Sequence, residues 1–311
     1  MAKPEIAVLR PVMPRILDAL TRDAVLHHPF GADDPEAALK ELSPRVRIAV
    51  TFGWCPAHVM EALPNLELIA SFAVGYDGID VEHARSRGIM VTNTPDVLTD
   101  EVANFAAALV LAVTRQIPRA DRYVREESWL QGVMPFNRTI IGRRIGIVGA
   151  GRIGQATARR LNALGADVVW HGPRPKPELP WPYYSDLAAM AADCFGLVLT
   201  CPGGAATRGI VNRDVMTAIG REGFLVNVAR GSVVDEPEMV SMLQDGSLGA
   251  AGLDVFRDEP NVPRELFGLD NVVLQPHQAS ATVETRNAMA DLVVENARLF
   301  LAGQPVRTPV T

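Results

Sequence analysis

The sequence is poor in the features that mark secreted and membrane proteins. Cysteine occurs only three times in 311 residues, as Cys55, Cys194 and Cys201, and its spacing fits neither a disulfide framework nor a zinc site. We therefore expect buried thiols in a reducing compartment. The longest strongly apolar stretch, residues 103–113, is too short to span a bilayer, and the start of the chain has no signal-peptide pattern. We expect a cytoplasmic protein that does not enter a membrane.

Runs of one charge are also absent. The formal net charge is −6, and no run of lysine or arginine provides the basic footprint of a general nucleic-acid-binding protein. Hydrophobic residues make up 48% and charged residues 21%, which is typical of a globular protein. No cluster with metal-ligand spacing is visible, so we expect no metal. The length favours two domains.

Short apolar runs alternate with helical patterns in both parts of the chain. In the first part, strand-like runs occupy residues 6–9, 46–51, 66–71 and 89–92. In the second part, they occupy residues 145–148, 167–170, 195–200, 224–228, 250–254 and 272–274. Such alternation predicts parallel sheets with helices on both faces, and hence the α/β fold class.

A glycine-rich turn follows the predicted strand 145–148 and opens a helix. Gly149 would allow the tight turn, Gly151 would let the backbone approach a pyrophosphate, and Gly154 would let helix and strand pack closely. The helix then begins with Arg152 and Ile153, where free N–H groups and the helix dipole favour phosphate. This context favours a dinucleotide site over an ordinary glycine-rich turn.

The next strand end indicates which dinucleotide binds. An acidic residue there would bind the ribose 2′-hydroxyl of NAD, but the segment contains Gly172, Arg174 and Lys176 and no carboxylate. A guanidinium can grip a 2′-phosphate, whereas an acid would repel it. We therefore favour NADP, although a solvated loop position for Arg174 remains the alternative.

Three polar residues follow later apolar strands. Arg230, Glu259 and His277 all come after such runs, and ligands of open α/β sheets bind beyond the carboxyl ends of the strands. Each alone would be an ordinary loop residue, but the recurrence at three strand ends indicates a site. An arginine there can bind an anionic group of a ligand, and a histidine is a proton donor tuned near neutral pH.

Several motifs in this order resemble the D-2-hydroxyacid dehydrogenase family. They are residues 92–98, 149–154, 227–231, 252–256, 259–260 and 276–282. Residues 71–77, 283–286 and 289–292 look most like the NADPH-preferring glyoxylate/hydroxypyruvate and hydroxyphenylpyruvate reductases within it. The resemblance covers essentially the whole chain.

The resemblance implies catalytic roles. Arg230 would bind the substrate carboxylate and polarise the ketone, and His277 would be the general acid. Glu259 would hydrogen-bond His277 and favour its protonated form. The backbone N–H groups of Val74 and Gly75 would hold the carboxylate of a small 2-keto acid.

The resemblance also implies cofactor contacts. Asp254 would contact the nicotinamide carboxamide, Ala229 precedes the catalytic arginine, and the loop at Cys201 and Pro202 would pass near the adenosine. That loop departs from the more polar one common in relatives. The residues after His277 depart too, since Gln278 begins a segment that often carries glycine and serine.

The family fold implies a discontinuous substrate-binding lid, 1–97 plus 288–311, and an NADP-binding Rossmann domain, 98–287. The two parallel-sheet domains, Rossmann-like or flavodoxin-like, would close a cleft on the substrate. A helix from about residue 100 to 115 is apolar on most faces. With the loop around Trp129, it leads us to expect a homodimer surface, although packing within the chain is the alternative.

Two other functions remain open at this point. The fold also serves non-catalytic dinucleotide-sensing proteins that bind partners, but the presence of Arg230, Glu259 and His277 together favours chemistry. An NAD-dependent dehydrogenase working in oxidation is the other, and Arg174 disfavours it. The candidates for the substrate pocket are Trp54, Trp129, Met134 and Phe136.

Overall fold

The computed structural model describes residues 3–311, and the chain forms two compact units. Unit 1 runs to Leu98 and resumes at Thr282–Thr311, while unit 2 is Thr99–Ala281. The second expected boundary, between residues 287 and 288, is wrong by six residues. It falls inside helix α11 (Val283–Leu301), whose N-cap Thr282 accepts a hydrogen bond from the backbone N–H of Thr285. One continuous helix belongs to one unit.

The sheet of unit 1 has five parallel strands in the order β2-β1-β3-β5-β7. They are β1 (Glu5–Val8), β2 (Val25–His27), β3 (Val46–Thr51), β5 (Leu68–Ser71) and β7 (Met90–Thr92). This is the flavodoxin-like order. A separate parallel pair joins β4 (Trp54–Cys55) to β6 (Gly78–Ile79). The chain end adds a bridge between Thr92 and Pro309 at the β7 edge.

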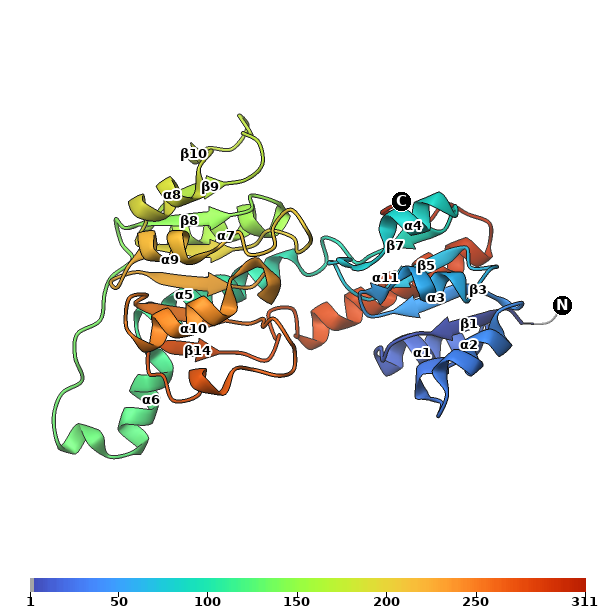
Figure 1. Cartoon of the computed structure of the whole chain (residues 1–311), viewed down its shortest axis with the longest axis horizontal. Helices are drawn as coiled ribbons and strands as arrows, with labels where there is room; N and C mark the ends of the chain where they lie inside the picture. The colour runs from blue at the N-terminus through green and yellow to red at the C-terminus, as the bar shows by residue number, and fades with distance from the viewer. Residues whose placement is uncertain (1–2) are drawn as a thin grey trace. The chain divides into compact units, whose positions relative to one another are not determined.

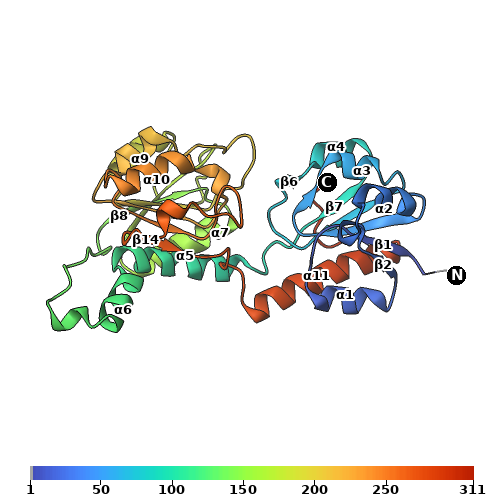
Figure 2. The same cartoon turned by 60° about the horizontal axis from the view of Figure 1, so that its bottom comes forward.

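Helices cover both faces of this sheet. They are α1 (Pro14–Thr21), α2 (Pro35–Leu42), α3 (Ala57–Glu61), α4 (Val81–Ser86) and α11, with a 3-10 turn at Pro29–Gly31. Figure 2 shows α1 and α11 on one face and α2, α3 and α4 on the other. All four residues of β5 are buried, as expected for a strand covered on both faces.

The sheet of unit 2 has seven parallel strands in the order β10-β9-β8-β11-β12-β13-β14. They are β8 (Arg144–Val148), β9 (Asp167–His171), β10 (Tyr183–Tyr184), β11 (Gly196–Leu199), β12 (Phe224–Asn227), β13 (Ala250–Leu253) and β14 (Val272–Leu274). The central part is the Rossmann order, with its topological switch point between β8 and β11. The expected α/β fold class with two parallel-sheet domains is confirmed.

The helices of unit 2 lie on both faces of its sheet (Figure 1). They are α5 (Thr99–Thr114), α6 (Ile117–Arg125), α7 (Arg152–Ala163), α8 (Leu187–Asp193), α9 (Arg213–Ile219) and α10 (Glu236–Gln244), with 3-10 turns at Ser128–Leu130, Gly231–Val233 and Arg264–Leu266. Among residues 3–311, no helix has both the length and the apolar character needed to cross a membrane.

Helix α5 is buried by the sheet of its own unit. It packs against α7, β12 and β13, and a Cβ placed on Gly252 of β13 would lie 2.9 Å from Val113 Cγ2. Packing within the chain, the alternative expected from the sequence, accounts for the buried face of this helix, and its part in a dimer surface stays a prediction. Its buried residues, among them Val102, Leu109 and Val113, pack within unit 2, and the next large exposed apolar side chains along the chain begin at α6.

Candidate active site

The predicted site residues of unit 2 follow strands at one edge of its sheet. Gly149 follows β8, Arg230 follows β12, Asp254 follows β13 and His277 follows β14. All these strands are parallel, so their carboxyl ends meet at the same edge. Local backbone hydrogen bonds fix the loops there, including one from Gly149 N to the His171 carbonyl oxygen at 2.8 Å.

The three glycines of the turn after β8 differ in whether a side chain would fit at their positions. Gly149 has φ 98°, and a Cβ there would lie 2.6 Å from Cys201 Cα. A Cβ on Gly154 would lie only 2.0 Å from the carbonyl oxygen of Gly149. Both positions therefore require glycine for packing within the protein. Gly151 differs, because a Cβ there would meet nothing within 4 Å and its φ is −76°.

The open space at Gly151 lies at the start of α7. Gly151 is the N-cap of this helix and has no side chain with which to cap it. Arg152 and Ile153 form the first helical positions, where backbone N–H groups have no partner within the helix and the positive end of the helix dipole lies. This is a cradle that fits the pyrophosphate of a dinucleotide.

The loop after β9 brings a cation to this turn. The Lys176 Nζ donates to the carbonyl oxygen of Ala150 at 2.7 Å, and Arg174 is exposed on the same loop. Gly172 is buried, and its carbonyl oxygen accepts from the Tyr183 hydroxyl at 3.0 Å. The sequence places a basic residue, Lys176, after this strand. It does not show the hydrogen bond from Lys176 to the glycine-rich turn, because that bond depends on how the loop folds.

His277 and Glu259 form a hydrogen-bonded pair. The distance from His277 Nδ1 to Glu259 Oε2 is 2.7 Å, and the other carboxylate oxygen accepts from Phe256 N at 3.0 Å. Burial alone would raise the pKa of Glu259, but the bonds from His277 and Phe256 and the charges of His277 and Arg230 outweigh it and lower that pKa. The carboxylate is therefore ionised at neutral pH and holds the imidazole ring through Nδ1.

Arg230 lies on a loop that is tied down at both ends. Asn227 is almost fully buried, and its side chain accepts from Ala229 N and donates to the Arg230 carbonyl oxygen, at 2.9 and 3.0 Å. A Cβ on Gly231 would lie 2.0 Å from the carbonyl carbon of Phe256. Glycine is therefore required to bring the Arg230 loop against the segment that carries Glu259.

Asp254 positions the loop of His277. Its side chain is buried and accepts from the backbone N–H groups of Gln278 and Ala279, at 2.6 and 3.0 Å, while His277 N donates to its carbonyl oxygen at 2.9 Å. Burial raises the pKa of Asp254, although the two N–H bonds oppose this. This role cannot be predicted from the sequence, since nothing in the motif shows where the carboxylate points.

Val74 and Gly75 lie in unit 1, on the loop after β5. The Asn93 side chain donates to the Val74 carbonyl oxygen at 2.9 Å, and Thr94 N donates to the Ala73 carbonyl oxygen at 3.0 Å. These bonds orient the peptide between Val74 and Gly75. The loop is thus held by the segment that follows β7.

The three thiols take no part in this site as nucleophiles. Burial raises the pKa of Cys55 to about 12, of Cys194 to about 12 and of Cys201 to about 11. All three are therefore protonated at neutral pH. No group of histidine, cysteine, aspartate or glutamate that could hold a metal occurs within residues 3–311.

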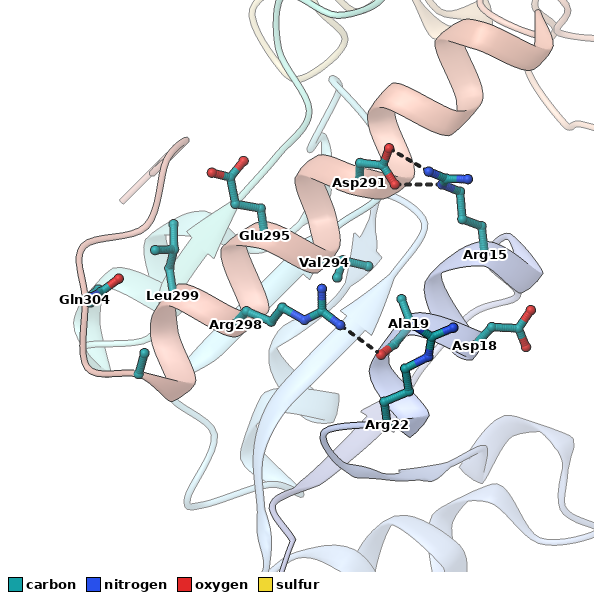
Figure 3. A pocket seen from close by; sticks show the side chains of 11 residues that line it. Arg15, Asp18, Ala19, Arg22, Asp291, Val294, Glu295, Arg298, Leu299 and Gln304 are labelled. Carbon is teal, nitrogen blue, oxygen red and sulfur yellow. Dashed lines mark hydrogen bonds and ion pairs between the residues drawn. The ribbon is translucent and has the colours of Figure 1, made fainter.

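A groove of about 890 Å³ lies elsewhere in unit 1, between α1 and α11 (Figure 3). Arg15 forms two hydrogen bonds to Asp291, at 2.6 and 2.9 Å. Arg298 pairs with Asp23 at 2.8 Å and also donates to the Ala19 carbonyl oxygen. These arginines join the helices to each other and to the loop after α1, and the groove holds none of the predicted site residues.

Comparison with known proteins shows the family. Residues 107–279 match the family described as D-isomer specific 2-hydroxyacid dehydrogenase, NAD binding domain. The chain is 46% identical over 273 residues to hydroxyphenylpyruvate reductase of Plectranthus scutellarioides, covering 88% of this chain and 87% of the relative. It is 41% identical to 2-ketogluconate reductase of Gluconobacter oxydans, covering 99% of both.

Solved structures agree. An NADPH-dependent glyoxylate/hydroxypyruvate reductase from Sinorhizobium meliloti, in complex with NADP and malonate, has a TM-score of 0.93 and 43% identity, covering 100% of this chain and 97% of that chain. The chain belongs to the D-isomer-specific 2-hydroxyacid dehydrogenase family and is an oxidoreductase of that family. The resemblance stated from the motifs is confirmed, and the expected cofactor agrees with the NADP in the similar structure.

Proposed function

We propose that this protein reduces a small 2-keto acid, glyoxylate or hydroxypyruvate, to the D-2-hydroxy acid with NADPH. The observation that carries the proposal is the pair of His277 Nδ1 and Glu259 Oε2 at 2.7 Å, on the strand edge that also bears Arg230. A histidine held through Nδ1 by an ionised carboxylate has its Nε2 left to donate a proton. This is the arrangement that a general acid needs.

Each residue has a defined task in this proposal. Arg230 binds the substrate carboxylate and stabilises the charge that develops on the carbonyl oxygen. His277 Nε2 donates the proton to that oxygen, and Glu259 stabilises the imidazolium before the transfer. The N–H groups of Val74 and Gly75 hold the substrate carboxylate. When bound, the nicotinamide supplies the hydride.

We propose that unit 2 holds the cofactor and unit 1 binds the substrate. The turn at Gly151 and the start of α7 would hold the pyrophosphate. The loops at Cys201 and Ala229 would line the rest of the cofactor site, and Asp254 would meet the carboxamide. Three buried, unpaired thiols fit the reducing compartment that we propose for the protein, the cytoplasm.

The NADP preference has its own test at Arg174. Arg174→Asp replaces a hydrogen-bond donor to the 2′-phosphate with a carboxylate that repels it. The ratio of kcat/KM for NADPH to kcat/KM for NADH should therefore fall at least about ten-fold. Arg221→Asp, at another exposed arginine of unit 2, is the matched control. An unchanged ratio in the Arg174 variant would show that this residue does not read the phosphate.

The activity is tested by following NADPH and NADH oxidation with glyoxylate, hydroxypyruvate and phenylpyruvate. Turnover of glyoxylate or hydroxypyruvate with NADPH is the expected result. Absence of turnover with every 2-keto acid would favour a non-catalytic, dinucleotide-sensing protein. Efficient oxidation of D-2-hydroxy acids with NAD, and poor reduction with NADPH, would instead support a dehydrogenase working in oxidation.

We also propose that the protein is a homodimer that uses the arm of unit 2, residues 117–141. No residue of α6 is buried, and the arm exposes large apolar side chains. They are Ile117, Val124, Trp129, Leu130, Val133, Phe136 and Ile141. Apolar side chains gathered on one segment mark an association surface, and a second copy of the chain is the partner we propose.

A further inference from the structure

The tail, residues 305–311, runs from the end of α11 back to the edge strand of the unit 1 sheet. Pro309 forms an antiparallel bridge with Thr92, and Val310 N donates to the Val91 carbonyl oxygen at 2.7 Å. The end of the chain therefore lies beside β7 (Figure 1). These contacts are made by the backbone, so they hold the tail in place whatever its side chains are.

The Thr308 hydroxyl connects the tail to Asn93, the first residue after β7. It donates to the Asn93 carbonyl oxygen at 2.7 Å and accepts from the Asn296 side chain at 3.0 Å. Asn296 lies on α11 and is almost fully buried, and its Oδ1 accepts from Arg307 N at 2.8 Å. A hydroxyl has a single proton to donate. Because Asn296 acts as the donor to Thr308, that proton is directed at the Asn93 carbonyl.

Asn93 carries the connection on to the loop after β5. Its side-chain amide donates to the Val74 carbonyl oxygen at 2.9 Å. The Val74 carbonyl and the Gly75 N–H belong to one planar trans peptide and point in opposite directions. A bond that fixes this carbonyl therefore also fixes the direction of the Gly75 N–H, one of the groups proposed to hold the substrate carboxylate. Side-chain hydrogen bonds thus lead from α11 to this peptide.

We propose that Thr308 and Asn296 are positioning residues for substrate binding, which act through Asn93 on the peptide between Val74 and Gly75. They keep the Gly75 N–H directed at the substrate carboxylate without touching the substrate themselves. This carboxylate is present in the substrate and in the transition state alike, so loss of the positioning should raise KM and leave kcat nearly unchanged. The inference rests on the proposed function, because it needs the carboxylate at this loop.

The test replaces Thr308 by valine, which keeps the shape of the side chain and removes the hydroxyl. KM for glyoxylate with NADPH should rise about five-fold, because one hydrogen bond of the path is lost, and kcat should stay within about two-fold. The dissociation constant of NADPH should also stay within about two-fold. Thr308→Ser keeps the hydroxyl and should have the wild-type KM. A KM that serine raises as much as valine would show that packing is responsible, and would overturn the inference.

Thr311→Val is the matched control. The Thr311 hydroxyl accepts from Val91 N at 2.9 Å and donates to the Ile89 carbonyl oxygen at 3.3 Å. It therefore bonds the tail to the same edge of the sheet without joining the path through Asn93. Both valine variants should lower the unfolding midpoint to a similar extent, because each loses the bonds of one hydroxyl. Only Thr308→Val should raise KM.

A double variant tests whether Thr308 acts through Asn93. Asn93→Ala removes the bond to Val74 and should raise KM for glyoxylate about ten-fold, and adding Thr308→Val should raise it no further. Glyoxylate turnover with the same KM in wild type and Thr308→Val, an equal rise in Thr311→Val, or additive rises in the double variant would overturn this inference alone. No turnover of any 2-keto acid by the wild type would overturn the proposed function as well.

Discussion

His277 combines an uncommon backbone conformation with a firmly held side chain. Its φ of 55° lies in the left-handed region that residues other than glycine seldom adopt. The Asp254 carbonyl and carboxylate oxygens hold the backbone from His277 to Ala279, and Glu259 holds the ring. The surrounding bonds therefore fix a conformation that the local sequence would not choose, as is typical of functional sites.

Removing the imidazole of His277 should lower the rate of the chemical step without weakening NADPH binding. His277→Ala should lower kcat for glyoxylate reduction by about 100-fold or more, because a general acid contributes that much. The dissociation constant of NADPH, measured by fluorescence titration, should stay within about two-fold, because the ring does not form the phosphate turn. His58→Ala, at an exposed histidine of α3, is the control. Equal losses of kcat and NADPH affinity would mean that His277 is structural.

The lowered pKa of Glu259 predicts a pH dependence of stability. A carboxylate whose folded pKa lies below its ordinary value of 4.5 stabilises the protein above pH 4.5 and loses that effect as the pH falls through the folded pKa. Glu259→Gln should therefore destabilise the protein most at neutral pH, and the difference from wild type should shrink at more acid pH. Urea unfolding of both proteins at pH 7 and near pH 4 measures this difference in the free energy of unfolding. A difference in unfolding free energy that grows on acidification would contradict a lowered pKa of Glu259 in the folded protein.

At the scale of elements, the sequence predicts the turn and the strands better than the short or edge elements. The glycine turn is readable because its three glycines stand at fixed spacing after an apolar strand, and the structure places them at the start of α7. Strand β2 (Val25–His27) is not detectable in the sequence, since it has three residues, none of them buried. It forms by pairing with β1, which is a tertiary contact.

Site geometry shows the same division. The residue types and strand ends of Arg230, Glu259 and His277 could be found from the sequence. The positioning bonds of Asp254 and Asn227 could not, because they depend on where neighbouring strands end in space. Sequence patterns report burial and periodicity, and they do not report which backbone N–H a buried carboxylate or amide will meet.

Two glycines of the turn should respond differently to alanine. Gly154→Ala should lower the free energy of unfolding by about 1–3 kcal/mol, because its Cβ would lie 2.0 Å from the carbonyl oxygen of Gly149. Gly151→Ala should leave stability unchanged, since its Cβ meets open space, and should weaken NADPH binding by at least about ten-fold. Denaturant unfolding and NADPH titration measure both variants. An unchanged NADPH affinity in Gly151→Ala would show that this turn does not bind the pyrophosphate.

At the scale of the whole chain, the arm of residues 117–141 has little attachment to unit 2. Arg119 and Arg122 of α6 pair with Asp270, and Arg138 pairs with Glu222. These are exposed ion pairs, which contribute little to stability each. Figure 1 shows α6 and the following segment standing off from the sheet of unit 2. Ile140, near the end of the arm, is buried, but the exposed apolar side chains of the arm would gain burial only against a further surface.

Breaking the apolar surface of the arm should give a folded monomer. Trp129 and Leu130 are 66% and 84% exposed, so Trp129→Ser with Leu130→Ser removes little packing within the chain and should leave the unfolding midpoint of the monomer unchanged. Sedimentation velocity should show a dimer for the wild type and a monomer, or an at least about 100-fold weaker dimer, for the double variant, because aromatic anchors dominate interfaces. Val283→Ser, at a residue of unit 1 that is 73% exposed, is the matched control and should remain dimeric. A wild-type monomer, or a double variant that dimerises as tightly as the wild type, would show that the arm does not form the interface.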